Sequence, residues 1–171
     1  MTALVIGGSG SGKSAWAESV IAKSPQKKRV YIATMQAADS ESETRVRRHR
    51  AQRASLGFET VERARDLGTL RLEAGCAALL EDIPNLLANE MFGGGDWQRI
   101  VPDIEKLSRQ CDLLIIVTGN VFCDGIRYDK STQQYLRHLA EINHAIAALA
   151  DTVTEVVYSI PVALKGALPC S

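Results

Sequence analysis

An eight-residue stretch near the start of the chain, Gly7-Gly8-Ser9-Gly10-Ser11-Gly12-Lys13-Ser14, constrains the fold more than any other feature. It fits the pattern G-x-x-x-x-G-K-[ST], whose glycines let the backbone wrap closely and turn successive N–H groups toward phosphate. An apolar run at 3–6 precedes it and reads as a buried strand, and residues 14–23 follow as a helix whose positive end also favours phosphate. In such a loop Lys13 reaches the β- and γ-phosphates, and the Ser14 hydroxyl binds Mg²⁺. The alternative, a flexible Gly/Ser turn that matches by chance, does not account for the strand before it and the helix after it.

The rest of the chain alternates between strand-like and helix-like segments. Strands are expected at 29–34, 58–62, 77–80, 112–118 and 154–160, and helices at 39–54, 84–91, 97–110 and 131–150. On the last helix the expected apolar face comprises Leu136, Leu139, Ala140, Ile146 and Ala147. The residues after 160 read as a tail. This alternation predicts an α/β fold of the P-loop NTPase type, a mostly parallel sheet with helices on both faces, in one nucleotide-binding domain over 1–171.

Composition narrows the classes of function. Twenty basic residues balance twenty acidic ones, so net charge gives no argument for nucleic acid or an anionic membrane as a partner. No apolar run approaches the roughly 18 residues of a membrane span, and because a strand begins at residue 3 we expect no signal peptide. The four cysteines include no C-x-x-C pair, so we expect neither a zinc site nor a disulfide framework, and we interpret Cys76 and Cys111 as packing residues. We therefore expect a cytoplasmic protein with reduced thiols.

A pair of acids follows the apolar run Leu79-Leu80, namely Glu81 and Asp82. In α/β folds the carboxyl ends of the strands form the ligand-binding edge, so one of these carboxylates is placed to bind Mg²⁺ directly or through water. We favour Glu81 for the metal. For Asp82 the alternative is the N-cap of the helix that begins near Pro84.

The segment from Arg45 to Arg53 holds five arginines and one histidine in nine positions. On a helix, Arg45, His49 and Arg53 share one face, where neighbouring guanidinium groups would lower the pKa of the imidazole. A neutral imidazole can attack phosphorus, and arginines can bind phosphate oxygens in pairs. Two alternatives remain: a solvated helix paired with acids such as Glu41 and Glu43, or an RNA-binding patch, which here lacks interleaved aromatic residues.

Several of these segments together resemble the bifunctional adenosylcobinamide kinase / adenosylcobinamide-phosphate guanylyltransferase family of cobalamin biosynthesis. They fall in family order across nearly the whole chain: the phosphate loop, Tyr31-Ile32-Ala33-Thr34, Arg45-Val46-Arg47-Arg48-His49-Arg50, Leu79-Leu80-Glu81, Val117-Thr118 and 160–166. The loop alone is generic. The Tyr-Ile-Ala-Thr strand followed by R-x-x-x-H-R is much more specific.

The resemblance implies a two-stage transferase. ATP or GTP, with Mg²⁺, phosphorylates the aminopropanol hydroxyl of adenosylcobinamide; GTP then guanylylates a histidine, which passes GMP to adenosylcobinamide phosphate. By position the catalytic residues would be His49, Lys13 and Arg50. The nucleotide contacts would be residues 7–14 together with Ala33, Thr34, Met35, Arg50, Ala51, Gln52, Arg53, Glu62 and Glu81, of which Ser14 and Glu81 bind the metal. The resemblance also implies a homotrimer.

The sequence departs from the family pattern in three places. Asn120 stands where the family has an acid after its fourth strand, and the loop at 123–129 differs from the usual type. Arg48 occupies the first position of a His-His pair, which leaves His49 as the candidate nucleophile. The rival functions are a small-molecule kinase or NTPase with no covalent step, and a nucleotide-sensing or RNA-binding module. Label retained from GTP labelled at the α-phosphate would separate these classes.

Overall fold

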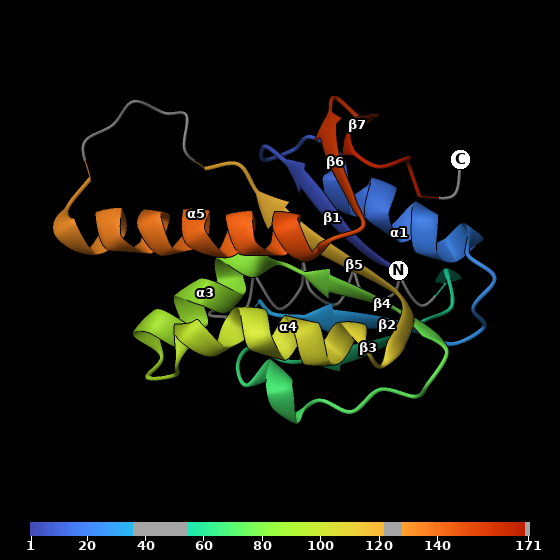
Figure 1. Ribbon diagram of the computed structural model, residues 1–171, viewed down its shortest axis with the longest axis horizontal. Helices are drawn as coiled ribbons and strands as arrows, with labels where there is room; N and C mark the ends of the chain where they lie inside the picture. Colours follow the sequence, from blue (N-terminus) through green and yellow to red (C-terminus); the bar gives the residue numbers. More distant parts are fainter. Residues whose placement is uncertain (36–54, 122–127, 170–171) are drawn as a thin grey trace.

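A seven-stranded sheet forms the centre of the computed structural model, which describes residues 1–35, 55–121 and 128–169. The strand order is β3-β2-β4-β5-β1-β6-β7, and every neighbouring pair is parallel except β6 with β7 (Figure 1). The strands are β1 (Thr2–Gly7), β2 (Arg29–Ala33), β3 (Phe58–Glu62), β4 (Cys76–Glu81), β5 (Cys111–Gly119), β6 (Thr152–Val157) and β7 (Ile160–Lys165). The phosphate-loop strand β1 thus lies inside the sheet, between β5 and β6.

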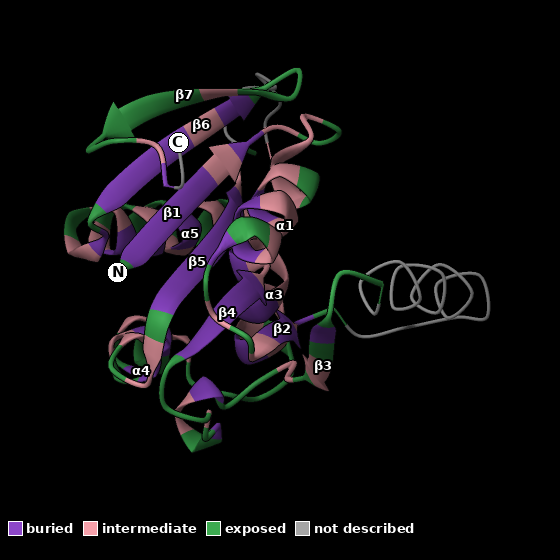
Figure 2. Ribbon diagram, turned by 90° about the vertical axis from the view of Figure 1, so that its right-hand side faces the viewer, coloured by how far each residue is buried: buried purple, intermediate pink, exposed green. Residues whose placement is uncertain are grey.

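Helices cover both faces of this sheet, as predicted. They are α1 (Lys13–Lys23), α3 (Ile83–Phe92), α4 (Ile100–Ser108) and α5 (Lys130–Leu149), with short 3₁₀ turns at Leu67–Thr69 and Trp97–Arg99. Side chains alternate along a strand, so Ala3 and Val5 of β1 pack in the cluster that contains α1, whereas Leu4 packs with α3, α4 and α5. Figure 2 shows the central strands buried along most of their length, which explains their nearly continuous apolar runs.

The end of the chain differs from the prediction. The expected strand at 154–160 is β6, which ends at Val157, and Ile160 begins a separate antiparallel strand where a tail was expected. Pro161 is tolerated because β7 is an edge strand. The buried face of α5 is also shifted: Leu139, Ile142 and Ile146 are buried, whereas Ala140 is exposed.

The remaining predicted elements are confirmed with small changes in their ends. The helix expected at 97–110 begins as a 3₁₀ turn and continues as α4. The helix expected at 39–54 lies outside the described residues. No helix in the described parts of the chain is long and apolar enough to cross a membrane.

Parallel pairing brings the carboxyl ends of the strands to one edge of the sheet. Gly7, the last residue of β1, is in register with Gly119 of β5. Further along the same edge, Ala33 of β2 is in register with both Glu81 of β4 and Glu62 of β3. Residues that are far apart in the sequence are therefore collected at the edge where α/β proteins bind ligands.

Candidate active site

The phosphate loop runs from the end of β1 into α1 with the backbone that its glycines permit. Gly10 and Gly12 have φ of 70° and 86°, a region that side chains other than glycine rarely adopt. Gly12 is the N-cap of α1, and the N–H of Trp16 donates to its carbonyl oxygen at 2.9 Å, which starts the helix directly at Lys13. The Lys13 ammonium donates to the carbonyl oxygen of Gly8 at 3.3 Å, across the mouth of the loop. A cationic group, the N-terminus of a helix and the backbone of the loop therefore lie together, and each of them favours a bound anion.

Glu81 meets the phosphate loop from β4. The Ser14 hydroxyl donates to Glu81 Oε1 at 2.5 Å, which joins the two groups that the sequence predicted to share a metal. Burial raises the pKa of Glu81 to about 7, and the nearby Asp82 carboxylate adds to the rise; the Ser14 hydroxyl and the Lys13 ammonium oppose it. Glu81 therefore holds a proton at a higher pH than an exposed glutamate does, and a cation that binds there displaces that proton.

The pair Ser14 and Glu81 fits Mg²⁺ chemically. Mg²⁺ prefers oxygen ligands and uses one or two carboxylates together with waters and phosphate oxygens rather than a complete protein cage. The second carboxylate oxygen of Glu81, Oε2, is buried and has no hydrogen-bond partner among the described residues. The described residues contain no group of three or more histidines, cysteines or acids that could hold a metal without such help. These residues suit an ion that arrives with a nucleotide.

Thr34, just after β2, hydrogen-bonds to the backbone of Glu81 and Asp82. Its side chain is fully buried, its Oγ1 lies 2.9 Å from the carbonyl oxygens of Glu81 and Asp82, and the Asp82 N–H donates to it at 2.8 Å. Asp82 in turn caps α3, because its carboxylate accepts from the N–H of Asn85 at 2.8 Å. The N-cap interpretation of Asp82 is confirmed. Burial raises the pKa of Asp82 as well.

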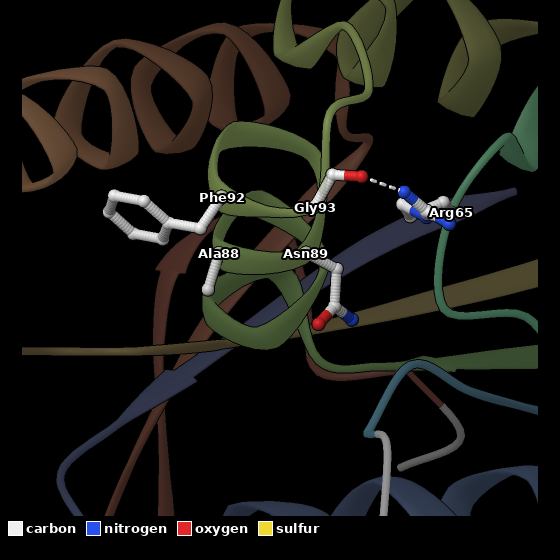
Figure 3. A pocket seen from close by; sticks show the side chains of 5 residues that line it. All are labelled: Arg65, Ala88, Asn89, Phe92 and Gly93. Carbon is white, nitrogen blue, oxygen red and sulfur yellow. Dashed lines mark hydrogen bonds between the residues drawn. The ribbon is translucent and has the colours of Figure 1, made fainter.

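Asn89, on α3, hydrogen-bonds to the backbone just after β2 and just after β3. Its Nδ2 donates to the carbonyl oxygen of Thr34 at 2.8 Å and to that of Ala64 at 3.1 Å. A cavity of about 340 Å³ lies beside it, and Figure 3 shows Arg65 reaching across to the carbonyl oxygen of Gly93 with Ala88 and Phe92 on the same helix. Nothing in the sequence pattern pointed to Asn89, because an amide on a helix has no signature until its partners are known.

The predicted site residues fall into two groups. The structure brings together the loop (residues 7–14), Glu81 and the segment Ala33-Thr34-Met35, with Glu62 one strand further along the edge. His49, Arg50, Ala51, Gln52 and Arg53 lie outside the described residues. The direct contacts of all these residues with a nucleotide stay predictions.

One protein family matches residues 3–164 of the chain, and it is described as cobinamide kinase / cobinamide phosphate guanyltransferase. The chain belongs to this family. It is 33% identical over 184 residues to the bifunctional adenosylcobalamin biosynthesis protein CobU of Salmonella typhimurium, across 96% of this chain and 100% of the relative. CobU of Escherichia coli gives the same figures. The bifunctional adenosylcobalamin biosynthesis protein CobP of Pseudomonas aeruginosa is 32% identical over 172 residues, which cover 97% and 98% of the two chains.

Membership of the cobinamide kinase / cobinamide phosphate guanyltransferase family confirms the predicted P-loop fold, the transferase class and the nucleotide substrates, GTP or ATP. It does not favour a kinase without a covalent step, nor a nucleotide-sensing or RNA-binding module. One departure from the family pattern can be located: the N–H of Asn120 donates to the carbonyl oxygen of Gly7 at 3.2 Å, so this residue stands at the entrance to the phosphate loop. Of the changed loop that follows, residues 122–127 lie outside the described residues.

Proposed function

We propose that this protein phosphorylates adenosylcobinamide and then transfers GMP from GTP to adenosylcobinamide phosphate through guanylylated His49, giving adenosylcobinamide-GDP. The observation that carries the proposal is the contact of Ser14 with Glu81 at a phosphate loop whose Lys13 faces the same edge. Family membership supplies the two half-reactions, and the described residues supply the groups that phosphoryl transfer requires.

In the kinase step the protein mainly positions and neutralises charge. The N–H groups of residues 7–14 and the Lys13 ammonium bind the phosphate oxygens, with Lys13 leaving the carbonyl of Gly8 for the incoming anion. Ser14 and Glu81 would hold Mg²⁺, which when bound neutralises charge on the β- and γ-phosphates. The acceptor hydroxyl oxygen bonds to the γ-phosphorus as the bond to the nucleoside diphosphate breaks, and the hydroxyl proton is released to solvent.

In the guanylyl step a neutral nitrogen of His49 attacks the α-phosphorus of GTP, and pyrophosphate leaves. A phosphate oxygen of adenosylcobinamide phosphate then attacks the same phosphorus, the P–N bond breaks, and His49 returns to its starting form. Arg50 to Arg53 are proposed to bind the nucleotide, with Arg50 stabilising the charge that develops on the phosphate. Ala33, Thr34, Met35 and Glu62 would complete the nucleotide contacts on the β2–β3 side of the edge.

Labelling tests this assignment directly. Incubation with GTP labelled at the α-phosphate should leave label on the wild-type protein that is labile in acid and stable in base, as a phosphoramidate is. His49→Asn should retain no label and make no adenosylcobinamide-GDP, yet should still phosphorylate adenosylcobinamide. His144→Asn, at an exposed position on α5, is the matched control and should label as the wild type does. A labelled His49→Asn protein would place the nucleophile elsewhere.

We also propose that the chain acts as one nucleotide-binding domain over 1–171, in the cytoplasm, as a homotrimer. Cys76 and Cys111 support a reducing compartment, since they are partners in the β4–β5 ladder and are both free thiols. Self-association is supported by β7, an edge strand on which Ile160 is 65% and Leu164 58% exposed. Light scattering on the wild type and on Leu164→Glu tests the assembly.

A further inference from the structure

A second cavity lies on the other side of the phosphate loop from β2 and β3. It has a volume of about 310 Å³ and is lined by residues 8–11 of the loop and by residues 155–158 at the end of β6. Glu155 contributes a carboxylate, and Tyr158, which is 90% exposed, contributes an aromatic ring at the rim. The nucleotide contacts proposed above, beyond the loop itself, use neither residue.

The turn that forms the outer wall of this cavity is fastened to the phosphate loop. The Ser159 N–H donates to the carbonyl oxygen of Ser11 at 2.8 Å. A Cβ added to Gly12 would lie 2.5 Å from Ser159 Oγ, so the turn packs directly on the loop glycine. Tyr158 and Ser159 have φ of 49° and 66°, a left-handed conformation that residues other than glycine, asparagine and aspartate seldom adopt. The close fit fixes the position of the turn relative to bound phosphate.

The chemistry of the cavity changes with distance from the loop. At the loop, N–H groups and Lys13 favour phosphate. Beyond it, the Glu155 carboxylate would repel phosphate but can accept hydrogen bonds from ribose hydroxyls, as acidic residues do in dinucleotide sites. The Tyr158 ring offers a face on which a base can stack, and such stacking does not require a particular base. The order phosphate, sugar, base therefore runs outward from the loop toward β7.

We propose that this cavity binds the ribose and base of the nucleoside triphosphate that donates its γ-phosphoryl group in the kinase step. Strand order supports a separate base site for each half-reaction. This cavity, at the end of β6, lies on one side of β1, whereas β2 is the third strand from β1 on the other side. A base bound in the cavity directs the γ-phosphate toward Ser14 and Glu81, where an acceptor hydroxyl can attack. The nucleotide contacts proposed for the guanylyl step include Ala33, Thr34 and Met35 at the end of β2, so a base bound there occupies a different site.

The test separates the base from the phosphates, and it rests on the kinase half of the proposed function. Tyr158→Asn removes the ring and keeps a residue that tolerates the left-handed turn. We expect it to raise the KM for ATP or GTP as kinase donor about tenfold, the size of one base–aromatic contact. Tyr158→Phe should restore the wild-type value. Ile160→Thr, on the same hairpin but outside the cavity lining, controls for effects on β7 or on self-association.

Inorganic tripolyphosphate distinguishes base binding from support of the loop. Its inhibition constant in the kinase assay should stay within twofold of wild type in Tyr158→Asn, and so should the GTP concentration for half-maximal labelling of His49. Equal weakening of tripolyphosphate would mean that the turn only supports the loop, and equal weakening of guanylylation would mean one shared base site; either result overturns the proposal, as does an unchanged donor KM.

Direct binding keeps the two proposals distinguishable. If the wild type makes no phosphorylated cobinamide, the proposed function fails, while calorimetry with ATP, GTP and tripolyphosphate still tests the base site. In that experiment Tyr158→Asn should weaken both nucleotides about tenfold and leave tripolyphosphate unchanged. Glu155→Ala, which removes the acceptor oxygens, should abolish any preference for a ribose over a 2′,3′-dideoxyribose nucleotide. If each of the three ligands binds the variants as tightly as it binds the wild type, there is no base site in this cavity.

Discussion

Replacing Glu81 by glutamine should make the protein more stable and less active. The Glu81 carboxyl is buried beside Asp82, and its pKa is raised from 4.5 to about 7. The protonated form is therefore favoured in the folded protein, whereas the unfolded chain ionises normally. As pH rises from about 4.5 to about 7 the unfolded chain loses its proton first, so Glu81 destabilises the fold progressively and then by a constant amount above pH 7. Glutamine keeps an oxygen for the Ser14 hydroxyl and does not ionise.

The magnitude follows from the two pKa values. At 1.36 kcal/mol for each pH unit between them, the raised pKa of Glu81 lowers the free energy of unfolding by about 3 kcal/mol at pH 8 and by about 1 kcal/mol at pH 5. The glutamine N–H groups would replace Oε2, which has no hydrogen-bond partner among the described residues, at a cost of about 1 kcal/mol. Glu81→Gln should thus be about 2 kcal/mol more stable than wild type at pH 8 and about equal to it at pH 5.

Urea denaturation of the ligand-free protein at the two pH values measures this difference. Glu105→Gln, a glutamate on α4 with a half-exposed side chain, serves as control and should change stability little at either pH. A Mg²⁺ titration of the kinase reaction should show a raised metal requirement for Glu81→Gln only. If Glu81→Gln is no more stable than wild type at pH 8, or is more stable by the same amount at both pH values, ionisation of the buried carboxyl does not control stability. An unchanged metal titration would remove Glu81 from the metal site.

Four further substitutions, the last with a control, test separate parts of the structure. Lys13→Ala should lower kinase turnover at least about 100-fold in a steady-state assay while leaving the thermal midpoint nearly unchanged, because the hydrogen bond that its ammonium makes within the described residues is to a loop carbonyl. Arg50→Ala should slow histidine labelling from GTP by about 10–100-fold without abolishing it, as rapid-quench measurement can show. Asn89→Ala removes a hydrogen-bond donor from two backbone carbonyls and should cost about 1–3 kcal/mol in urea denaturation and raise the KM for GTP more than it lowers kcat. Ile142→Ala should cost about 2–5 kcal/mol by the same method, whereas Ala140→Ser should be nearly neutral.

Much of the site could be predicted because it is either local or fixed by sheet geometry. The loop from Gly7 to Ser14 carries its conformation in its own glycines. The meeting of Glu81 with Ser14 follows from a rule about strand ends that holds for any parallel sheet. Asn89 could not be predicted, because its two acceptors, on Thr34 and Ala64, come near α3 only after the sheet has formed.

The last strand escaped prediction for identifiable reasons. Tyr158 and Ser159 form its turn without the glycine or asparagine that normally marks a tight hairpin, and Pro161 argues against a strand when edge and centre cannot be told apart. On α5, small alanines leave the apolar stripe ambiguous by one step around the helix. Packing against α3 and the sheet resolves it in favour of Ile142.

The position of β1 inside the sheet has a consequence for the newborn chain. The phosphate loop leaves the ribosome first, yet β1 pairs with β5 from Leu114 onward and with β6 from Thr152 onward. At about 5–20 residues per second, roughly 8–30 s of synthesis separate the loop from its last strand partner. Until β5 has been synthesised, the apolar strand β1 has no strand partner, and until β6 follows it has only one of its two partners among the described strands. The chain should therefore gain its affinity for nucleotide only near the end of translation. Chains that are released early should not bind nucleotide and should tend to aggregate.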